Sequence, residues 1–103
     1  MNEILPFLKS MISAPGLSGD EAPVRVLIEE SWQPLTDELT VSRLGSLHAL
    51  KRGSAQKPRP GILLAAHMDA IGLIVSAVVG DVLRLRDIGG LDHRVLPGQL
   101  VTV

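Results

Sequence analysis

The sequence has 103 residues, 10 of them basic and 11 acidic, for a formal net charge of −1. This length allows about one domain with one modest hydrophobic core. The balanced charge and the aromatic fraction of 2% argue against a nucleic-acid partner, which needs a basic surface with aromatic side chains for stacking. Because there is no cysteine, disulfide bonds, thiolate nucleophiles and cysteine-ligated metals are excluded.

Neither a membrane anchor nor a secretion signal is evident in the sequence. Every apolar run is far shorter than the roughly 20 residues of a membrane span. Residues 1–3 also lack the positive charge that opens a signal peptide. We therefore expect a cytoplasmic protein that has no membrane partner.

A first helix is predicted over residues 2–13, with Asn2 as its N-cap. Alanine, proline and glycine at residues 14–16 end this helix. Its apolar side chains recur with the period of one helix face. They are Ile4, Leu5, Leu8, Met11 and Ile12.

A second helix is predicted from Ser18 to about Trp32. Ser18 followed three residues later by Glu21 is a capping-box pattern, in which each side chain bonds a backbone N–H at the start of the helix. Pro34 ends the helix. The inner face is expected to carry Val24, Leu27, Ile28 and Trp32.

The pattern beyond residue 37 is that of β-strands. They are predicted over residues 38–41, 46–51, 61–66, 71–79, 82–86 and 99–103, with turns at residues 43–45 and 80–81 and a solvated loop at residues 53–60. Residues 61–66 are apolar throughout, which favours a strand buried on both faces of a sheet covered by helices. The shift from helices to strands predicts two domains, over residues 1–70 and 71–103.

Two residues with metal-site chemistry follow the predicted strand 61–66. His67 and Asp69 are separated by one residue, and in open α/β sheets the functional groups lie beyond the carboxyl ends of strands. A neutral imidazole ligates zinc or cobalt. An aspartate two residues away can hydrogen-bond such a ligand and fix its tautomer. Because this spacing is common by chance, a histidine and an aspartate that only cap the following turn remain the alternative.

Further short blocks surround the His-Met-Asp segment in a fixed order. They read APGLSGDE at residues 14–21, RLGSL at 43–47, ILLAAHMD at 62–69, IGLIV at 71–75, IGGLD at 88–92 and RVLPGQ at 94–99. Together these blocks resemble the glutamyl, or tetrahedral (TET-like), metallo-aminopeptidases of peptidase clan MH. Some members of this family carry the name cellulase M or endoglucanase.

The resemblance implies an α/β fold, with a two-metal exopeptidase-type sheet and flanking helices. A small PDZ-like or barrel-like β domain interrupts this sheet. Residues 1–70 would be the N-terminal part of the catalytic domain, and residues 71–103 the first strands of the inserted dimerisation domain. Only the first part of each domain would then be present in the chain.

The resemblance also implies an activity and a set of partners. Such enzymes hydrolyse N-terminal residues from peptides with a water molecule activated by two divalent metal ions, zinc or cobalt, while a glutamate acts as general base. His67 matches a metal ligand, and Asp69 matches a residue that supports catalysis by orienting the site. The implied partners are peptides with a free N-terminus and further copies of the chain, assembled as a dodecamer.

The sequence departs from the family pattern at Ala70, Ser46 and Ser42, where a glutamate, an asparagine and an aspartate are usual. The family's remaining metal ligands and its general base match no residue of this chain. Since a zinc ion needs three or four ligands, we expect the 103-residue chain alone to be inactive. The alternative is a non-catalytic fragment, or an assembly or interaction module derived from the family.

The other polar candidates are expected to have structural roles. His48 is predicted on a strand surface and His93 in an exposed loop. Glu29 and Glu30 are adjacent on a helix, so their carboxylates do not face each other and form a solvated face. Leu-Ser-Gly-Asp at residues 17–20 lacks a nucleophile elbow, and the predicted helix cap explains Ser18 better.

Overall fold

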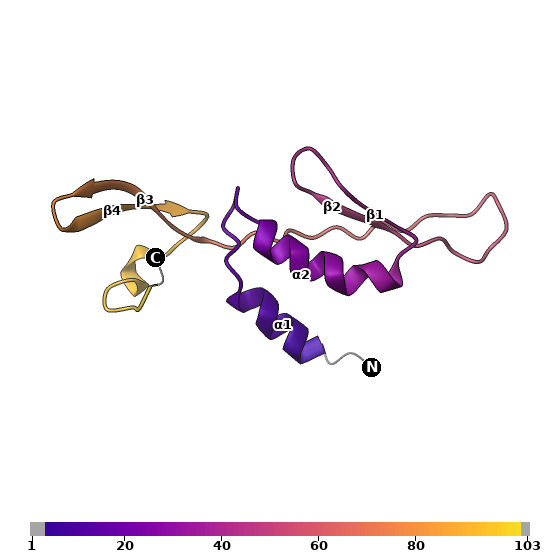
Figure 1. The fold of residues 1–103 in the computed structure, drawn as a ribbon, viewed down its shortest axis with the longest axis horizontal. Coiled ribbons are helices and arrows are strands. Elements are labelled where there is room, and N and C mark those ends of the chain that lie inside the picture. The colour runs from indigo at the N-terminus through magenta and orange to yellow at the C-terminus, as the bar shows by residue number, and fades with distance from the viewer. Residues whose placement is uncertain (1–3, 102–103) are drawn as a thin grey trace. The chain divides into compact units, whose positions relative to one another are not determined.

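The computed structural model describes residues 4–101, which form a mixed α/β structure of helices and two-stranded sheets (Figure 1). The chain divides into two compact units, residues 1–69 and 70–103. Neither α-helix of the described residues has the length and apolar character needed to cross a bilayer.

Two α-helices open the first unit, as the sequence predicts. They are α1 (Ile4–Ser13) and α2 (Ala22–Trp32), and a short 3-10 helix, η1 (Gln33–Leu35), follows α2. The expected N-cap Asn2 lies outside the described residues. Pro34 falls inside η1, so the α-helical pattern ends just before it, as predicted.

The predicted start of the second helix at Ser18 is wrong. The N-cap of α2 is Glu21, and no side chain caps the helix. Gly19 has a φ of +94°, which a continuing helix cannot contain. The Glu21 carboxylate accepts the backbone N–H of Gly19 at 2.6 Å, so it closes a turn before the helix. Pro23, in the first helical turn, needs no N–H acceptor there.

The buried core of the first unit lies on α2. Val24 and Ile28 are buried, and Leu27 is half-buried, as expected for the inner face. Trp32 was expected on that face but is 38% exposed. Gly16 is also buried, and a Cβ atom there would lie 2.6 Å from Cγ2 of Val24.

An antiparallel hairpin follows, formed by β1 (Glu38–Val41) and β2 (Leu47–Leu50), and α2 packs against β2. The predicted strands and their turn are confirmed. Gly45 has a φ of +88° and donates its N–H to the carbonyl of Ser42 at 3.0 Å. The open end of the hairpin is held by Asp37, whose carboxylate accepts the backbone N–H of Arg52 at 2.5 Å and Nζ of Lys51 at 3.2 Å.

The predicted buried strand over residues 61–66 is contradicted. The segment forms no strand, and its side chains are exposed, with Leu63 and Leu64 each 89% exposed. A strand of this kind needs a neighbouring strand and a covering layer, and both sheets of the described residues are isolated hairpins that do not include it. The loop over residues 53–60 has neither helix nor strand, as expected.

The second unit is built on a longer antiparallel hairpin, β3 (Gly72–Val79) and β4 (Val82–Ile88). The predicted turn is confirmed, and Gly80 adopts a φ of +58° there. A 3-10 helix, η2 (His93–Val95), follows the hairpin. The strand predicted over residues 99–103 is wrong for residues 99–101, which form no strand, while residues 102–103 lie outside the described residues.

A β-bulge interrupts β3 at Ser76. Val75 pairs with Leu85 and Ala77 pairs with Arg84, so two steps along β3 correspond to one step along β4. The Ser76 hydroxyl donates to the carbonyl of Arg84 at 3.1 Å. Because paired residues share a face of the ribbon, the bulge places Val78 on the same face as Leu73 and Val75. The partners of these three residues on that face are Leu83, Leu85 and Asp87.

Candidate functional site

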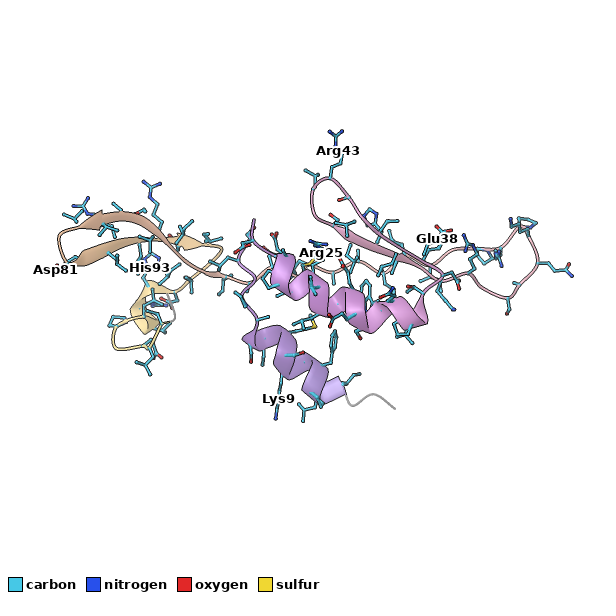
Figure 2. All side chains as sticks on the ribbon, in the orientation of Figure 1. Lys9, Arg25, Glu38, Arg43, Asp81 and His93 are labelled. Atoms are coloured by element: carbon cyan, nitrogen blue, oxygen red, sulfur yellow. The ribbon has the colours of Figure 1, made fainter. Side chains whose placement is uncertain are left out.

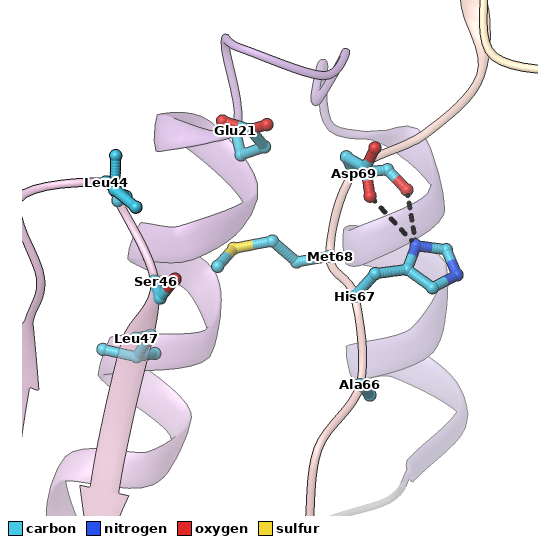
Figure 3. A pocket seen from close by; sticks show the side chains of 9 residues that line it. Glu21, Leu44, Ser46, Leu47, Ala66, His67, Met68 and Asp69 are labelled. Carbon is cyan, nitrogen blue, oxygen red and sulfur yellow. Dashed lines mark hydrogen bonds and ion pairs between the residues drawn. The ribbon is translucent and has the colours of Figure 1, made fainter.

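The His67 imidazole is held by Asp69 in the first unit. Its Nδ1 atom lies 3.1 Å from the Asp69 backbone carbonyl oxygen and 3.1 Å from Oδ1 of the same residue (Figure 3). Both partners are acceptors, so Nδ1 carries the proton and donates. In the neutral ring, the second nitrogen, Nε2, then has its lone pair available.

The two side chains differ in exposure. The His67 side chain is 85% exposed, whereas that of Asp69 is 38% exposed. The structure therefore brings the two predicted site residues together, with the imidazole directed to solvent and the carboxylate behind it. This is the arrangement in which an aspartate orients a histidine ligand.

A cavity of about 220 Å³ lies beside this pair in the first unit. Its walls come from the N-terminal end of α2, the β1–β2 turn and the segment that carries the pair. The lining residues are Glu21, Leu44, Gly45, Ser46, Leu47, Ala66, His67, Met68 and Asp69. Figure 3 shows the Met68 side chain extending toward Ser46, away from the His67 ring.

Sequence reasoning gave no site role to Glu21, Met68 or the β1–β2 turn. A usable signal was present for Met68, because side chains of an extended segment alternate in direction. If His67 and Asp69 point one way, Met68 points the other. Glu21 gives no comparable signal, since the fold alone brings the start of α2 to this cavity.

The donor chemistry of the site fits one ligand of a metal ion. Neutral imidazole suits zinc and cobalt, and the Asp69 carboxylate is engaged with Nδ1. Across residues 4–101, no three His, Asp or Glu side chains converge as a metal cage requires. The described residues therefore fit one corner of such a site, and the ligand role of His67 stays a prediction.

The remaining polar candidates lie elsewhere. His48 is an exposed residue of β2, as predicted, and Arg25 pairs with Glu29 on α2 at 2.5 Å. In the second unit, Nε2 of His93 lies 3.8 Å from Oδ1 of Asp87. The His93 side chain is labelled in Figure 2. His93 is exposed, as expected, but lies in η2 rather than in a loop.

Carboxylates outside the cavity have partners that lower their pKa. The pKa of Asp92 is lowered because the Arg94 side chain and then its backbone N–H donate to it, and the pKa of Arg94 is raised by the same contact. The pKa of Asp37 is lowered by the backbone N–H of Arg52 first and by the Lys51 ammonium second. All three groups lie outside the cavity lining, so these shifts bear on folding.

Comparison with known proteins gives a consistent picture. Residues 45–103 match the family model of the M42 glutamyl aminopeptidases. Over 96 residues the chain is 38% identical to a lysyl aminopeptidase of Pyrococcus furiosus, covering 91% of this chain and 25% of that protein. The relatives are thus much longer than the chain.

Two solved structures are also similar. The TET aminopeptidase of a marine sediment Thaumarchaeota archaeon superposes with a TM-score of 0.83 at 35% identity, over 92% of this chain and 26% of that one. A Thermotoga maritima protein described as an endoglucanase has a TM-score of 0.77 at 39% identity, over 89% of this chain and 29% of that one.

Proposed function

Because the chain belongs to the M42 glutamyl aminopeptidase family, we propose that it is part of a metal-dependent aminopeptidase. In this proposal His67 ligates one of two divalent metal ions through Nε2, and Asp69 orients the ring. The substrates are peptides with a free N-terminus. When bound, such ions, zinc or cobalt, polarise a water molecule and the scissile carbonyl.

One observation carries the proposal for His67. In the neutral ring, the bond from Nδ1 to Asp69 places the proton on Nδ1, so Nε2 carries the lone pair that a metal ligand requires. The bond to the carboxylate also restricts the rotation of the ring. The His67 side chain is 85% exposed, so Nε2 is accessible to a metal ion.

The two units give the proposal its domain organisation. Residues 1–70 are the N-terminal part of the catalytic α/β domain, and residues 71–103 are the first strands of an inserted β domain used for assembly. The separation of the chain at residues 69 and 70 supports this division. The TET aminopeptidase among the similar structures supports assembly into a homo-oligomer. We propose that this homo-oligomer is a dodecamer and that it acts in the cytoplasm.

The 103-residue chain alone is proposed to be inactive, because a single imidazole holds a metal ion only weakly. The test is hydrolysis of aminoacyl p-nitroanilides by the purified chain, with zinc or cobalt added and with a chelator as control. We expect no chelator-sensitive release. Robust, chelator-sensitive release would contradict this part of the proposal.

The ligand role of His67 is tested in the natural protein that contains this chain. We expect His67→Ala to remove one metal ion and the activity, and Asp69→Ala to weaken metal affinity about 10- to 100-fold. His48→Ala, an exposed histidine of β2, is the matched control and should change neither. Full metal content in His67→Ala would overturn the assignment.

The alternative, a non-catalytic assembly module, makes a different prediction about the natural protein. It requires an intact mass of 11.0 kDa, which is that of the chain itself, and no bound metal. Intact-mass spectrometry with metal analysis separates the two.

A further inference from the structure

The segment before His67 has little to hold it in place. Every residue from 61 to 67 is exposed, and none belongs to a strand. Partial burial begins with Met68 and continues in Asp69. The position of the imidazole therefore depends on what happens at the two residues that follow it.

Met68 lies on the opposite side of the segment from the His67–Asp69 pair. His67 and Asp69 are two residues apart and bond to each other, so they share a side. Met68 between them lines the cavity and extends toward the β1–β2 turn (Figure 3). An unbranched thioether side chain adapts well to an irregular apolar gap of this kind.

Met68 faces a turn whose backbone is held by hydrogen bonds. In the β1–β2 turn the Ser46 backbone N–H donates to the Ser42 hydroxyl at 3.1 Å, and the Ser42 N–H donates to the Ser46 carbonyl at 2.9 Å. β2 in turn packs against α2, which carries the buried side chains of this unit. The turn is therefore held by its own hydrogen bonds and by the packing of β2 on α2. It can limit where the Met68 side chain lies.

We propose that Met68 is a positioning residue for the candidate site. Its side chain, which extends toward Ser46 at the wall of the shared cavity, determines which side of the segment residues 66–69 present to solvent. This setting presents His67 and Asp69 together on the outer side, where Nδ1 can donate to the carboxylate. The inference rests on the proposed function only in giving the His67–Asp69 pair its purpose.

The test uses the tautomer of His67 in the 103-residue chain without metal. Imidazole ¹⁵N shifts are recorded at about pH 8.5, well above the ordinary imidazole pKa of about 6.5. The wild-type chain should show an excess of the Nδ1–H tautomer. Met68→Ser should lose that excess, with shifts moving to those of a free imidazole, and Met68→Leu should retain it.

A control variant separates positioning from general loss of apolar surface. Leu64→Ser makes a similar deletion at a side chain that is 89% exposed and does not line the cavity. It should leave the tautomer excess unchanged. Amide shifts of β1 and β2 report whether each variant keeps the hairpin.

Each outcome decides a definite point. If the wild-type chain lacks the Nδ1–H excess, the His67–Asp69 bond is absent. This inference then fails, and so does the observation on which the proposed role of His67 rests. If the excess is present but survives in Met68→Ser, the inference alone fails. A measurement that needs no variant is the NOE between the Met68 methyl group and the Ser46 and Leu47 side chains. Its absence would also overturn the inference.

Discussion

The two hairpins found in residues 4–101 have similar local features but different surroundings. Each has a glycine with positive φ in its turn, Gly45 in β1–β2 and Gly80 in β3–β4. The first hairpin packs against α2, which has two buried apolar side chains. The second unit has no buried residue between residues 70 and 101.

The difference shows that turn residues specify how two strands pair but do not by themselves make the hairpin stable. A suitable turn and an alternating pattern are enough to specify which residues pair. Stability requires a second layer that removes apolar side chains from water. The first unit has that layer and the second, within the described residues, does not.

The largest effect is expected in the core of the first unit. Ile28→Ala should lower the free energy of unfolding by about 3 kcal/mol, because it leaves a cavity under α2. Urea unfolding followed by the fluorescence of Trp32, which lies in the same unit, measures it. The control in the second unit is Val78→Ala in β3, because the Val78 side chain is 67% exposed. Amide exchange should show that it lowers the free energy of opening by less than about 0.5 kcal/mol. Equal losses of free energy for Ile28→Ala and Val78→Ala would contradict the difference between the two units.

A smaller effect is expected where the core approaches the backbone. Gly16→Ala places a Cβ atom 2.6 Å from Cγ2 of Val24 and should cost about 2 kcal/mol through overpacking. In a Val24→Ala background the same change should cost less, because the clashing methyl group is gone. Gly53→Ala, where the new atom meets nothing within 4 Å, is the control. Strictly additive costs in the double variant would contradict the clash.

The two turns offer a matched pair of substitutions. Gly45→Ala and Gly80→Ala each force a side chain into the left-handed region, at a φ of +88° and +58°, with a cost of about 1 kcal/mol. We expect β3–β4 to lose amide protection while β1–β2 keeps it, because only the latter is supported by a helix. Equal loss in both hairpins would show that α2 contributes nothing to the first.

The smallest effect is expected from acid. Because the pKa of Asp37 is lowered by its bonds to Arg52 and Lys51, the ionised carboxylate stabilises the folded hairpin. This stabilisation is complete above the ordinary aspartate pKa of about 3.9. It is lost as the pH falls through the lowered pKa of the folded state. Amide exchange in β1–β2 between about pH 5 and 2 should show it. Asp37→Asn should remove the dependence.

Asp92 provides the contrasting case in the second unit. Its pKa is lowered in the same direction, but its partner Arg94 is two residues away in the same turn. Acid should therefore loosen only the start of η2 and leave the exchange of β4 unchanged. Loss of β4 protection in parallel with the Asp92 titration would contradict this.

Local patterns predicted the elements whose partners are close in sequence. Both helices and the strands of both hairpins were predictable because periodicity and turn residues specify them locally. The strand expected at residues 61–66 was not confirmed, because such a strand needs partners distant in sequence. Ser18 was a misleading cap, since the backbone of Gly19 leaves the helical path.

The site was predictable in part. His67 and Asp69 could be chosen from spacing and resemblance, and the structure brings them within 3.1 Å of each other. Their chemical roles remain predictions. Glu21 and Ser46 could not be chosen, because only the packing of α2 and the hairpin turn places them at the same cavity.

The bulge at Ser76 has a consequence for how β3 tolerates changes in chain length. Removing one residue from a strand normally turns every following side chain to the opposite face. Removing Ser76 would instead restore one-to-one pairing, because Ala77 already pairs with Arg84 next to the pair of Val75 and Leu85. A chain lacking Ser76 should keep the amide protection of β4, whereas one lacking Val78 should lose it. Residue 76 is thus the position in β3 where a sequence one residue shorter would encode the same ribbon.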